Sequence, residues 1–388
     1  MKYLKLFFSL ILITLFFFSC SKDDNPIQPD NQLMKLNESE LQKVLDNYVA
    51  NTAGVLGVIQ KVEIPGYEPW TGASGYFDIS KTTKLDGNEL FSIGSITKTF
   101  TATMILQLYE EGIIELGIPI INYLPQDYKN VLTDIPFGDR ATIYQALCHK
   151  TGFYNYIWNW DHFLAPIFTN PGKHWTPMEK LLIVKNYGTS DFAPGESYHY
   201  SNTNYLLLGI ILEFLDQKIY ANTLKDRITS KIELDETFYH GDVIGDNFEN
   251  FAHGYDDELG RKYDTREFNL SSSYAEGGII STTGDLIKFF KALVNCELYS
   301  DPNTFEIMLN ESDNYEYGLG IIVKNNPIWG KYYEHGGSML GQKSIIQYVV
   351  KNNLIIASCL TQDGTVEYND PEEVVDLMLN KLNELGIG

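Results

Sequence analysis

Two residues at the start of an apolar helical segment have the types and the spacing that covalent catalysis requires. In the stretch "FSIGSITKTFTATMILQLYEEG", residues 91–112, Lys98 follows Ser95 by three positions, so both side chains share one face of a helix. A serine hydroxyl is a weak nucleophile until a neighbouring base removes its proton. Lysine acts as that base when burial or nearby positive charge lowers its pKa. Because no charged residue occurs from Thr99 to Tyr109, the helix should be buried and should supply that burial.

The spacing of Ser95 and Lys98 does not by itself establish a catalytic pair. Lys98 could instead be a surface lysine whose aliphatic chain lies along the helix while its ammonium reaches water. Another serine–lysine pair with the same spacing, Ser19 and Lys22, lies at the end of the N-terminal apolar run and is attributed to chance. The decision therefore depends on which motifs follow and in what order.

Two later motifs could complete a catalytic site. In "PGESYHYSNTNYLLLG", residues 194–209, Tyr200 and Asn202 lie just before an apolar helix. The stretch "EHGGSMLG", residues 334–341, places His335, Gly336 and Gly337 on an expected strand and is followed by Ser338 within the same motif. Glycines on a strand let a ligand backbone approach and pair with the strand edge.

These three motifs, in this order, resemble those of the serine β-lactamase and penicillin-binding-protein superfamily. The resemblance is closest to its class C β-lactamase and D-alanyl-D-alanine carboxypeptidase branch. It extends from about residue 38 to residue 385 and includes the blocks "ALCHKTGF", "GGIISTTGDLIKF" and "YGLG". The resemblance implies that Ser95 is the acylated nucleophile and that Lys98 orients and activates it. Tyr200 would share the proton relay and then protonate the leaving group.

The resemblance also implies the substrate-binding residues. Asn202 would hold Lys98 and the substrate amide, and His335, Gly336 and Gly337 would occupy the strand that carries Lys-Thr-Gly in most members. The backbone N–H groups of Ser95 and Ser338 would form the oxyanion hole. The resemblance implies no cofactor and no metal.

The His-Gly-Gly strand departs from the family pattern and leaves the function open. Histidine is largely neutral near pH 7, with an ordinary pKa near ~6.5, and the threonine hydroxyl is missing. Both changes predict a weaker grip on the carboxylate of a β-lactam or a D-alanyl terminus. The expected function is that of a serine acyl hydrolase working through an acyl-enzyme, with D-alanyl-D-alanine carboxypeptidase or β-lactamase-like amide hydrolysis first. A carboxylesterase of the same family, or a catalytically decayed surface binding lipoprotein, remains as an alternative.

The elements that would position these residues predict an α/β (α+β) fold. Helical patterns cover residues 39–50, 141–148, 177–187, 203–216 and 371–385, and β-type patterns cover 55–62, 72–79, 317–323, 331–337, 344–350 and 353–360. Such an order predicts an antiparallel sheet flanked by helices and built from both chain ends, with a mostly helical lobe inserted between them. We expect an α/β lobe formed by residues 38–112 and 276–388, and a helical lobe formed by residues 113–275. Catalytic clefts favour such lobe boundaries.

Composition limits the partners of this chain. Its 388 residues carry a net charge of −22, which argues against nucleic acid and against attachment to anionic lipid by charge alone. The expected partner is a small molecule or a peptidoglycan-derived peptide. Cys148, Cys296 and Cys359 are expected to be core thiols, with one pair at most. The aromatic loop "FYNYIWNW", residues 153–160, could either line the cleft or form loop core.

The N-terminus predicts lipid anchoring. Basic Lys2 and Lys5 precede an apolar run that ends at Ser19 and Cys20, too short to span a bilayer comfortably. This end resembles the lipobox of bacterial lipoproteins, which implies a signal peptide of residues 1–19 and lipidation of Cys20. Residues 20–37 would form a flexible tether. The expected location is the bacterial cell envelope, lipid-anchored at the outer membrane and either periplasmic or surface-exposed, with membrane contact only through that anchor.

Overall fold

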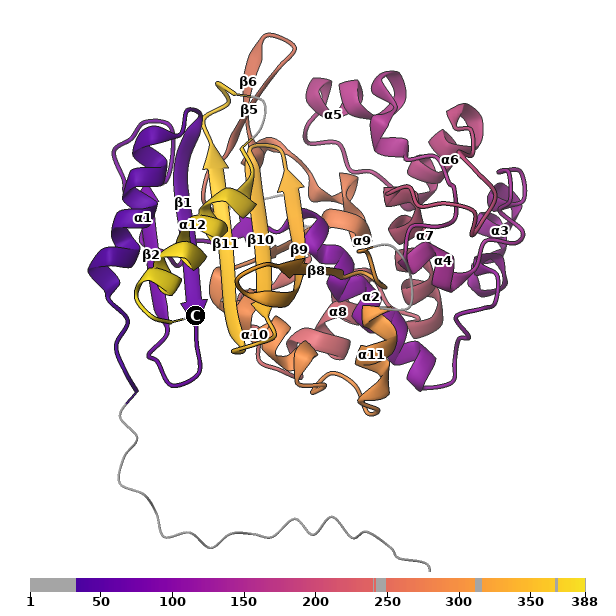
Figure 1. The fold of residues 1–388 in the computed structure, drawn as a ribbon. Coiled ribbons are helices and arrows are strands. Elements are labelled where there is room, and N and C mark those ends of the chain that lie inside the picture. The colour runs from indigo at the N-terminus through magenta and orange to yellow at the C-terminus, as the bar shows by residue number, and fades with distance from the viewer. Residues whose placement is uncertain (1–32, 240, 242–248, 311–315, 367–368, 388) are drawn as a thin grey trace, which may run out of the picture.

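Strands from both ends of the chain form the central sheet of this computed structural model, which describes residues 33–239, 241, 249–310, 316–366 and 369–387. The sheet has six strands in the order β2-β1-β11-β10-β9-β8, and every neighbouring pair is antiparallel. The strands are β1 (Val55–Glu63), β2 (Trp70–Gly75), β8 (Ile322–Asn326), β9 (Gly330–Met339), β10 (Gln342–Val349) and β11 (Leu354–Gln362). The predicted antiparallel sheet with flanking helices is confirmed (Figure 1). The predicted signal peptide, Cys20 and most of the predicted tether lie outside the described residues.

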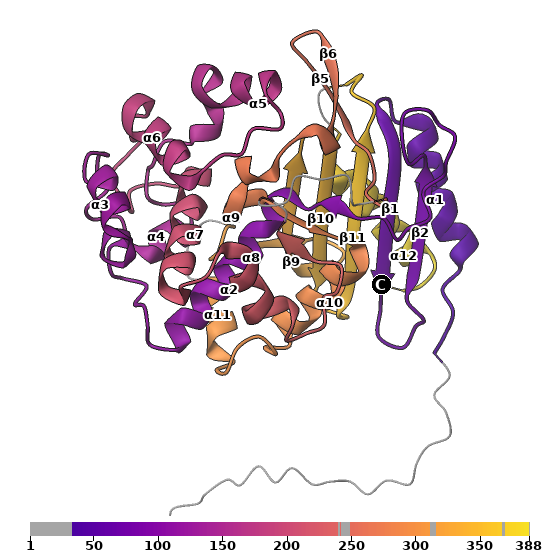
Figure 2. The same ribbon diagram turned by 180° about the vertical axis from the view of Figure 1, so that it is seen from behind.

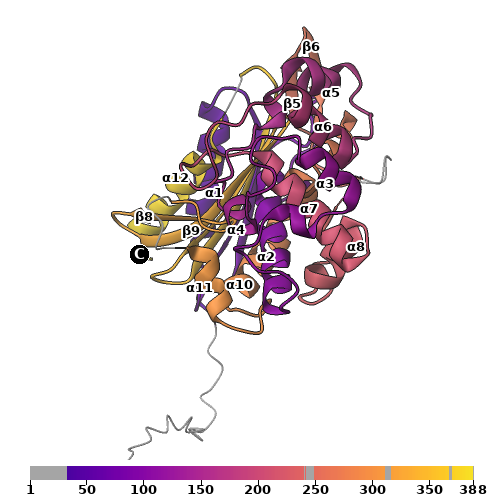
Figure 3. The ribbon, with the colours of Figure 1, turned by 90° about the vertical axis from the view of Figure 1, so that its right-hand side faces the viewer.

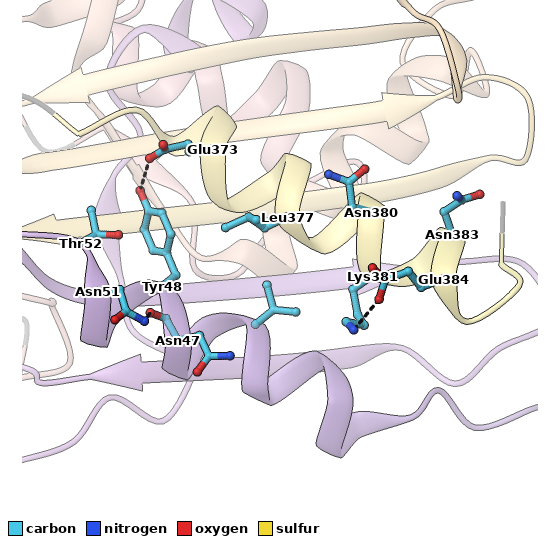
Figure 4. Close-up of a pocket in the computed structure, with 11 residues that line it drawn as sticks. Asn47, Tyr48, Asn51, Thr52, Glu373, Leu377, Asn380, Lys381, Asn383 and Glu384 are labelled. Carbon is cyan, nitrogen blue, oxygen red and sulfur yellow. Dashed lines mark hydrogen bonds and ion pairs between the residues drawn. The ribbon is translucent and has the colours of Figure 1, made fainter.

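Two terminal helices cover one face of this sheet. They are α1 (Glu38–Asn51) and α12 (Pro371–Glu384), which lie together on the same side of the strands (Figures 1 and 3). Their apolar residues Leu45 and Val374 join Val58 and Ile356 of the sheet in one buried cluster. A groove runs between the two helices. Four asparagines, Asn47, Asn51, Asn380 and Asn383, are among its lining residues, and the Tyr48 hydroxyl donates to Glu373 at 3.4 Å there (Figure 4).

The opposite face carries the helices that lead to the catalytic motifs. These are α2 (Thr97–Glu110) and α10 (Thr283–Val294), joined by stacking of Phe100 on Phe289 at 3.6 Å between ring centroids. A small sheet of β3 (Phe91–Ser92), β7 (Ile279–Ser281) and β4 (Phe238–Tyr239) leads into both helices. Thr282 caps α10 by accepting from the Asp285 amide at 3.2 Å.

Most of the remaining helices lie to one side of the sheet (Figures 1 and 2). They are α3 (Gln126–Leu132), α4 (Ile143–Leu147), α5 (Ala165–Thr169), α6 (Pro177–Tyr187), α7 (Asn202–Asp216) and α8 (Tyr220–Leu224). The other elements are the hairpin β5 (Tyr255–Glu258) and β6 (Arg261–Asp264), and the helices α9 (Tyr274–Gly277) and α11 (Asn303–Leu309). Helices α2, α7 and α9 pack against one another. The bounds of the two predicted lobes stay predictions.

Several local expectations are wrong in detail. Asn37 caps α1 by accepting from the Glu40 amide at 3.4 Å, so the helix begins at Glu38, one residue before the predicted start. The strand expected over residues 317–323 begins only at Ile322, because Gly320 has a φ of +82° and its loop packs so closely on α2 that a Cβ would lie 2.4 Å from the Ala102 Cβ. None of the three cysteines in the described part of the chain forms a disulfide; Cys148 and Cys359 are buried as expected, whereas Cys296 is only partly buried. None of the helices in these described ranges combines the length and apolar character that crossing a membrane requires.

Candidate active site

Ser95 lies in a tight turn between β3 and α2. Gly94 has a φ of +50°, and a Cβ at this position would lie 2.5 Å from the Ser338 amide nitrogen. Glycine is therefore required both by the backbone conformation and by the approach of β9. The turn η1 (Gly94–Ile96) then runs directly into α2. This arrangement brings the backbone amide of Ser338 next to the residue that precedes Ser95.

Lys98 is fully buried and lies against Ser95. Its Nζ is 3.1 Å from Ser95 Oγ, 2.7 Å from Asn202 Oδ1 and 2.7 Å from the Glu276 carbonyl oxygen. Burial lowers the pKa of Lys98 to about 7, although the Glu276 carboxylate opposes that shift. The lysine is 0% exposed, so the alternative of a surface lysine is wrong.

Tyr200 faces the same pair from the loop before α7. Its side chain is hydrogen-bonded to that of Ser95, and Lys98 Nζ lies 4.9 Å from the centroid of its ring. Burial raises the pKa of Tyr200 above its ordinary value, and the hydrogen bond with Ser95 partly offsets that effect. A neutral phenol therefore faces Ser95 at neutral pH, where it can pass a proton but does not compete with Lys98 for one.

Asn202 is held by a residue that the sequence analysis did not single out. Both the amide nitrogen and the side-chain Nδ2 of Asn202 donate to Asn155 Oδ1, at 3.1 and 3.3 Å. Asn155 lies in the aromatic loop. Tyr156 of that loop is buried, as expected for loop core, whereas Trp158 and Trp160 are 68% and 44% exposed. The expectation that Asn202 lies beside Lys98 matches the observed geometry.

His149 is a second site residue to which the sequence assigns no role. It lies in the block "ALCHKTGF", which supports the resemblance as a whole. Its Nδ1 accepts from the Ser201 amide at 3.2 Å and from Asn204 Nδ2 at 3.1 Å. Burial lowers the pKa of His149, so the ring is neutral. It packs 4.2 Å from the ring of Tyr200, measured between centroids, and so helps to fix that phenol.

His335 lies close to this cluster, and its expected titration near neutral pH is wrong. Its side chain is 2% exposed, and burial lowers its pKa to about 3. Nδ1 lies 2.7 Å from the Gly336 carbonyl oxygen and donates to it, while Nε2 accepts from the Tyr317 hydroxyl at 3.0 Å. The imidazole is therefore a neutral, hydrogen-bonded group.

The part of β9 that carries the His-Gly-Gly motif is unpaired on one edge within the described residues. Strand β8 pairs with β9 only as far as Glu334, so residues 335–339 have no strand on that side in the described ranges. Gly337 is required there, because a Cβ would lie 1.9 Å from the Ile93 carbonyl oxygen and 2.7 Å from Ser344 Oγ. An extended substrate could pair along this edge.

A lysine lies beside Ser338 at the same strand. Lys343 on β10 is the cross-strand partner of Ser338, and its Nζ lies 2.6 Å from Ser338 Oγ. The Lys343 side chain is largely buried, which lowers its pKa, while Asp256 acts in the opposite direction. No local motif marks Lys343, because its position depends on strand register. The described ranges contain no group of three or more His, Cys, Asp or Glu side chains placed to hold a metal ion.

Comparison with known proteins agrees with this geometry. The chain is 28% identical over 304 residues to penicillin-binding protein 4* of Bacillus subtilis, covering 73% of this chain and only 63% of that protein. It is 23% identical to the teichoic acid D-alanine hydrolase of Staphylococcus aureus, over 94% and 92% of the two chains. The crystal structure of a D-stereospecific amidohydrolase from Streptomyces sp. superposes with a TM-score of 0.76 at 27% identity, over 88% and 98% of the chains.

The match to a family model covers most of the described chain. The model described as Beta-lactamase matches residues 41–377, a span that includes every candidate residue from Ser95 to Ser338. The chain therefore belongs to the beta-lactamase family of serine hydrolases.

Proposed function

We propose that this protein is a serine acyl hydrolase that works through a covalent acyl-enzyme, with amide hydrolysis of the D-alanyl-D-alanine carboxypeptidase or β-lactamase type as its first activity. One observation carries the proposal. Lys98 Nζ lies 3.1 Å from Ser95 Oγ, in a buried position that lowers the lysine pKa to about 7. A lysine with that pKa is neutral in a large fraction of molecules at pH 7 and can accept a proton.

The side chains support a complete acylation cycle. Neutral Lys98 accepts the Ser95 proton while Oγ bonds to the acyl carbon, and the resulting oxyanion lies between the amides of Ser95 and Ser338. Tyr200 donates its phenolic proton to the leaving nitrogen or oxygen as the scissile bond breaks, and it recovers a proton from the Lys98 ammonium. Water then attacks the acyl carbon and gives its proton to Lys98, while Tyr200 protonates Ser95 Oγ as the acyl C–O bond breaks and again recovers a proton from Lys98.

A D-configured acyl donor is the substrate class that the comparisons support. The named relatives include a teichoic acid D-alanine hydrolase and a D-stereospecific amidohydrolase. A peptidoglycan-derived peptide ending in D-alanine combines such a residue with a free carboxylate. The cation of Lys343 beside Ser338 offers that carboxylate a partner which the neutral His335 does not, and it supports placing amide hydrolysis first.

Ester hydrolysis is the second candidate. The neutral His335 and the missing threonine hydroxyl favour acyl donors without a carboxylate. A carboxylesterase of this family would use the same Ser95, Lys98 and Tyr200, and only the recognition of the group beyond the scissile bond would differ.

Covalent labelling tests the proposal and separates the candidates. Purified protein is incubated with a fluorescent penicillin or with a fluorophosphonate, and its intact mass is measured, with Ser95→Ala as the control. Labelling by both probes supports amide hydrolysis, and labelling by the fluorophosphonate alone supports the esterase. Ser95→Ala should show no adduct while its melting temperature stays nearly unchanged, because the lost volume is small. Absence of any adduct on the wild-type protein would refute the proposal and favour a binding lipoprotein.

A further inference from the structure

A buried ion pair adjoins the catalytic cluster and has no role in the cycle described above. Lys180 on α6 and Glu276 on α9 are 0% and 2% exposed, and Lys180 Nζ lies 2.9 Å from Glu276 Oε1. The Tyr156 hydroxyl donates to the same oxygen. Glu276 Oε2 is buried and has no hydrogen-bond partner within the described ranges. The charge of this carboxylate is thus balanced mainly by one ammonium group.

Glu276 connects this ion pair to Lys98. Its carbonyl oxygen accepts from Lys98 Nζ at 2.7 Å, while its carboxylate binds Lys180. The Lys180 ammonium has three hydrogens, and its other contacts are the carbonyl oxygens of Ser271 and Ser272, at 3.2 and 3.4 Å. Lys180 therefore binds both the backbone of the segment before α9 and the Glu276 side chain on α9. Both contacts hold the Glu276 carbonyl group in place against Lys98.

The energetics of buried ion pairs point to a role beyond stability. Replacing such a pair by apolar residues is often neutral or stabilising, whereas removing one partner leaves an uncompensated charge. Here the Glu276 carboxylate opposes the lowering of the Lys98 pKa by burial. Lys180 pairs with that carboxylate at 2.9 Å. The net charge of the Lys180–Glu276 pair therefore affects the protonation of the Lys98 amine.

We propose that Lys180 and Glu276 are positioning residues that hold the Glu276 carbonyl against Lys98 and set how firmly the Lys98 amine binds a proton. The inference rests on the proposed function, because it takes Lys98 to be the base that activates Ser95. Both residues act through Lys98.

Other ionisable groups surround these residues and are the same in every variant proposed below. Those around Lys98 are Tyr200 before α7, Tyr205 on α7, His149 after α4 and His335 on β9. Those around Lys180 are Tyr156, Tyr274, Glu179 on its own helix and Glu213 on α7.

The pH dependence of acylation in the full chain tests the proposal. The probe is a fluorophosphonate, which is uncharged, so the pH at which its reaction rate reaches half its plateau reports on the protein. Lys180→Met leaves the Glu276 carboxylate without its cation, so that half-plateau pH should rise by about one unit or more. Glu276→Gln removes the negative charge, and the half-plateau pH should fall by a similar amount. The double variant Lys180→Met/Glu276→Gln removes both charges and should return close to the wild type.

A lysine on the same helix supplies the matched control. Lys185 pairs with Asp134 at 2.6 Å near the surface, and Lys185→Met should leave the half-plateau pH unchanged. A purely structural role would lower the melting temperature or the plateau rate of the variants without moving that pH, and this result would overturn the inference. If Lys180→Met does not fold, the sign of the shift in Glu276→Gln decides, because glutamine keeps an acceptor for Lys180. A wild-type protein that never reacts with the probe would refute the proposed function instead.

Discussion

Burial of Lys98 makes acylation depend on pH near neutrality. Below its pKa of about 7 the amine is protonated and cannot accept the Ser95 proton, whereas Tyr200 stays neutral because burial raises its pKa. The rate of fluorophosphonate labelling should therefore increase with pH through about 7 and then reach a plateau. One pH unit below the midpoint it should be about tenfold slower than the plateau.

Lys98→Arg is the control for this pH profile. Arginine keeps the positive charge but stays protonated at every accessible pH, so this variant should not be labelled anywhere in the range. A wild-type rate that is independent of pH between about 5 and 9 would show that Lys98 is not the base. Labelling of the arginine variant would show the same.

His335 should not titrate in the physiological range. With a pKa of about 3 caused by burial, its imidazole stays neutral between about pH 5 and 8. The KM for a carboxylate-bearing D-alanyl peptide should therefore show no inflection near 6.5, once the titration of the peptide itself is accounted for. An inflection near 6.5 in the wild type that disappears in His335→Gln would contradict this prediction.

At the residue scale, the sequence predicts the side chains that lie in motifs and misses those that reach the site through tertiary contacts. Ser95 and Lys98 share one helical turn, and the observed hydrogen bond between them follows from their spacing. Asn155 and Glu276 belong to no motif. Asn155 accepts from Asn202 through its side chain, and Glu276 accepts from Lys98 through its backbone carbonyl oxygen. Such contacts depend on how α2, α7 and α9 pack, which local patterns do not encode.

At the element scale, the close approach of β9 to the Ser95 turn makes one of the two adjacent glycines, Gly336 and Gly337, indispensable. A Cβ on Gly337 would lie 1.9 Å from the Ile93 carbonyl oxygen, whereas the nearest atom to a Cβ on Gly336 is the Ser344 oxygen at 3.8 Å. Gly337→Ala should therefore push β9 away from the turn and abolish fluorophosphonate labelling. Overpacking of this kind costs about 1–3 kcal/mol, so the melting temperature should fall as well.

Gly336→Ala is the matched control for the strand. The added methyl group meets no close neighbour, so the melting temperature should stay near the wild-type value and the Ser338 amide should keep its position beside the Ser95 turn. Equal labelling of the two variants would show that the separation between β9 and Ile93 does not control the oxyanion hole.

Helices with a strong apolar pattern are predicted well from the sequence. Short strands that form only through pairing with distant parts of the chain are not. The predicted helices over 177–187 and 203–216 correspond to α6 and α7 within one residue, since both are apolar and begin at clear caps or loops. The two-residue strands β3 and β4 carry no pattern of their own. Both strands form by pairing with β7, which lies between them. Strand β3 leads directly into the turn that contains Ser95.

At the scale of the whole molecule, the fold places α2, which carries Lys98, and the terminal helices on opposite faces of one sheet. The pairing of β1 with β11 joins strands from the two ends of the chain, and the β-type runs at both ends predict a sheet built in this way. Helix α1 then lies on the face away from α2 (Figure 3). Of the described residues before α1, Leu36 packs with the terminal helices, whereas Leu33 lines a pocket together with Lys291 and Val294 of α10.

A lipid on Cys20 would anchor the chain through the predicted tether. The predicted tether of residues 20–37 spans at most about 60 Å when extended, enough to hold the body away from a bilayer. We expect the full chain produced in a bacterium to sediment with membranes and Cys20→Ala to appear in the soluble fraction, with the same fluorophosphonate labelling per molecule. Cys296→Ala, which changes a partly exposed free thiol in the body, should stay with the membranes. Membrane association of Cys20→Ala would mean that another part of the chain anchors it.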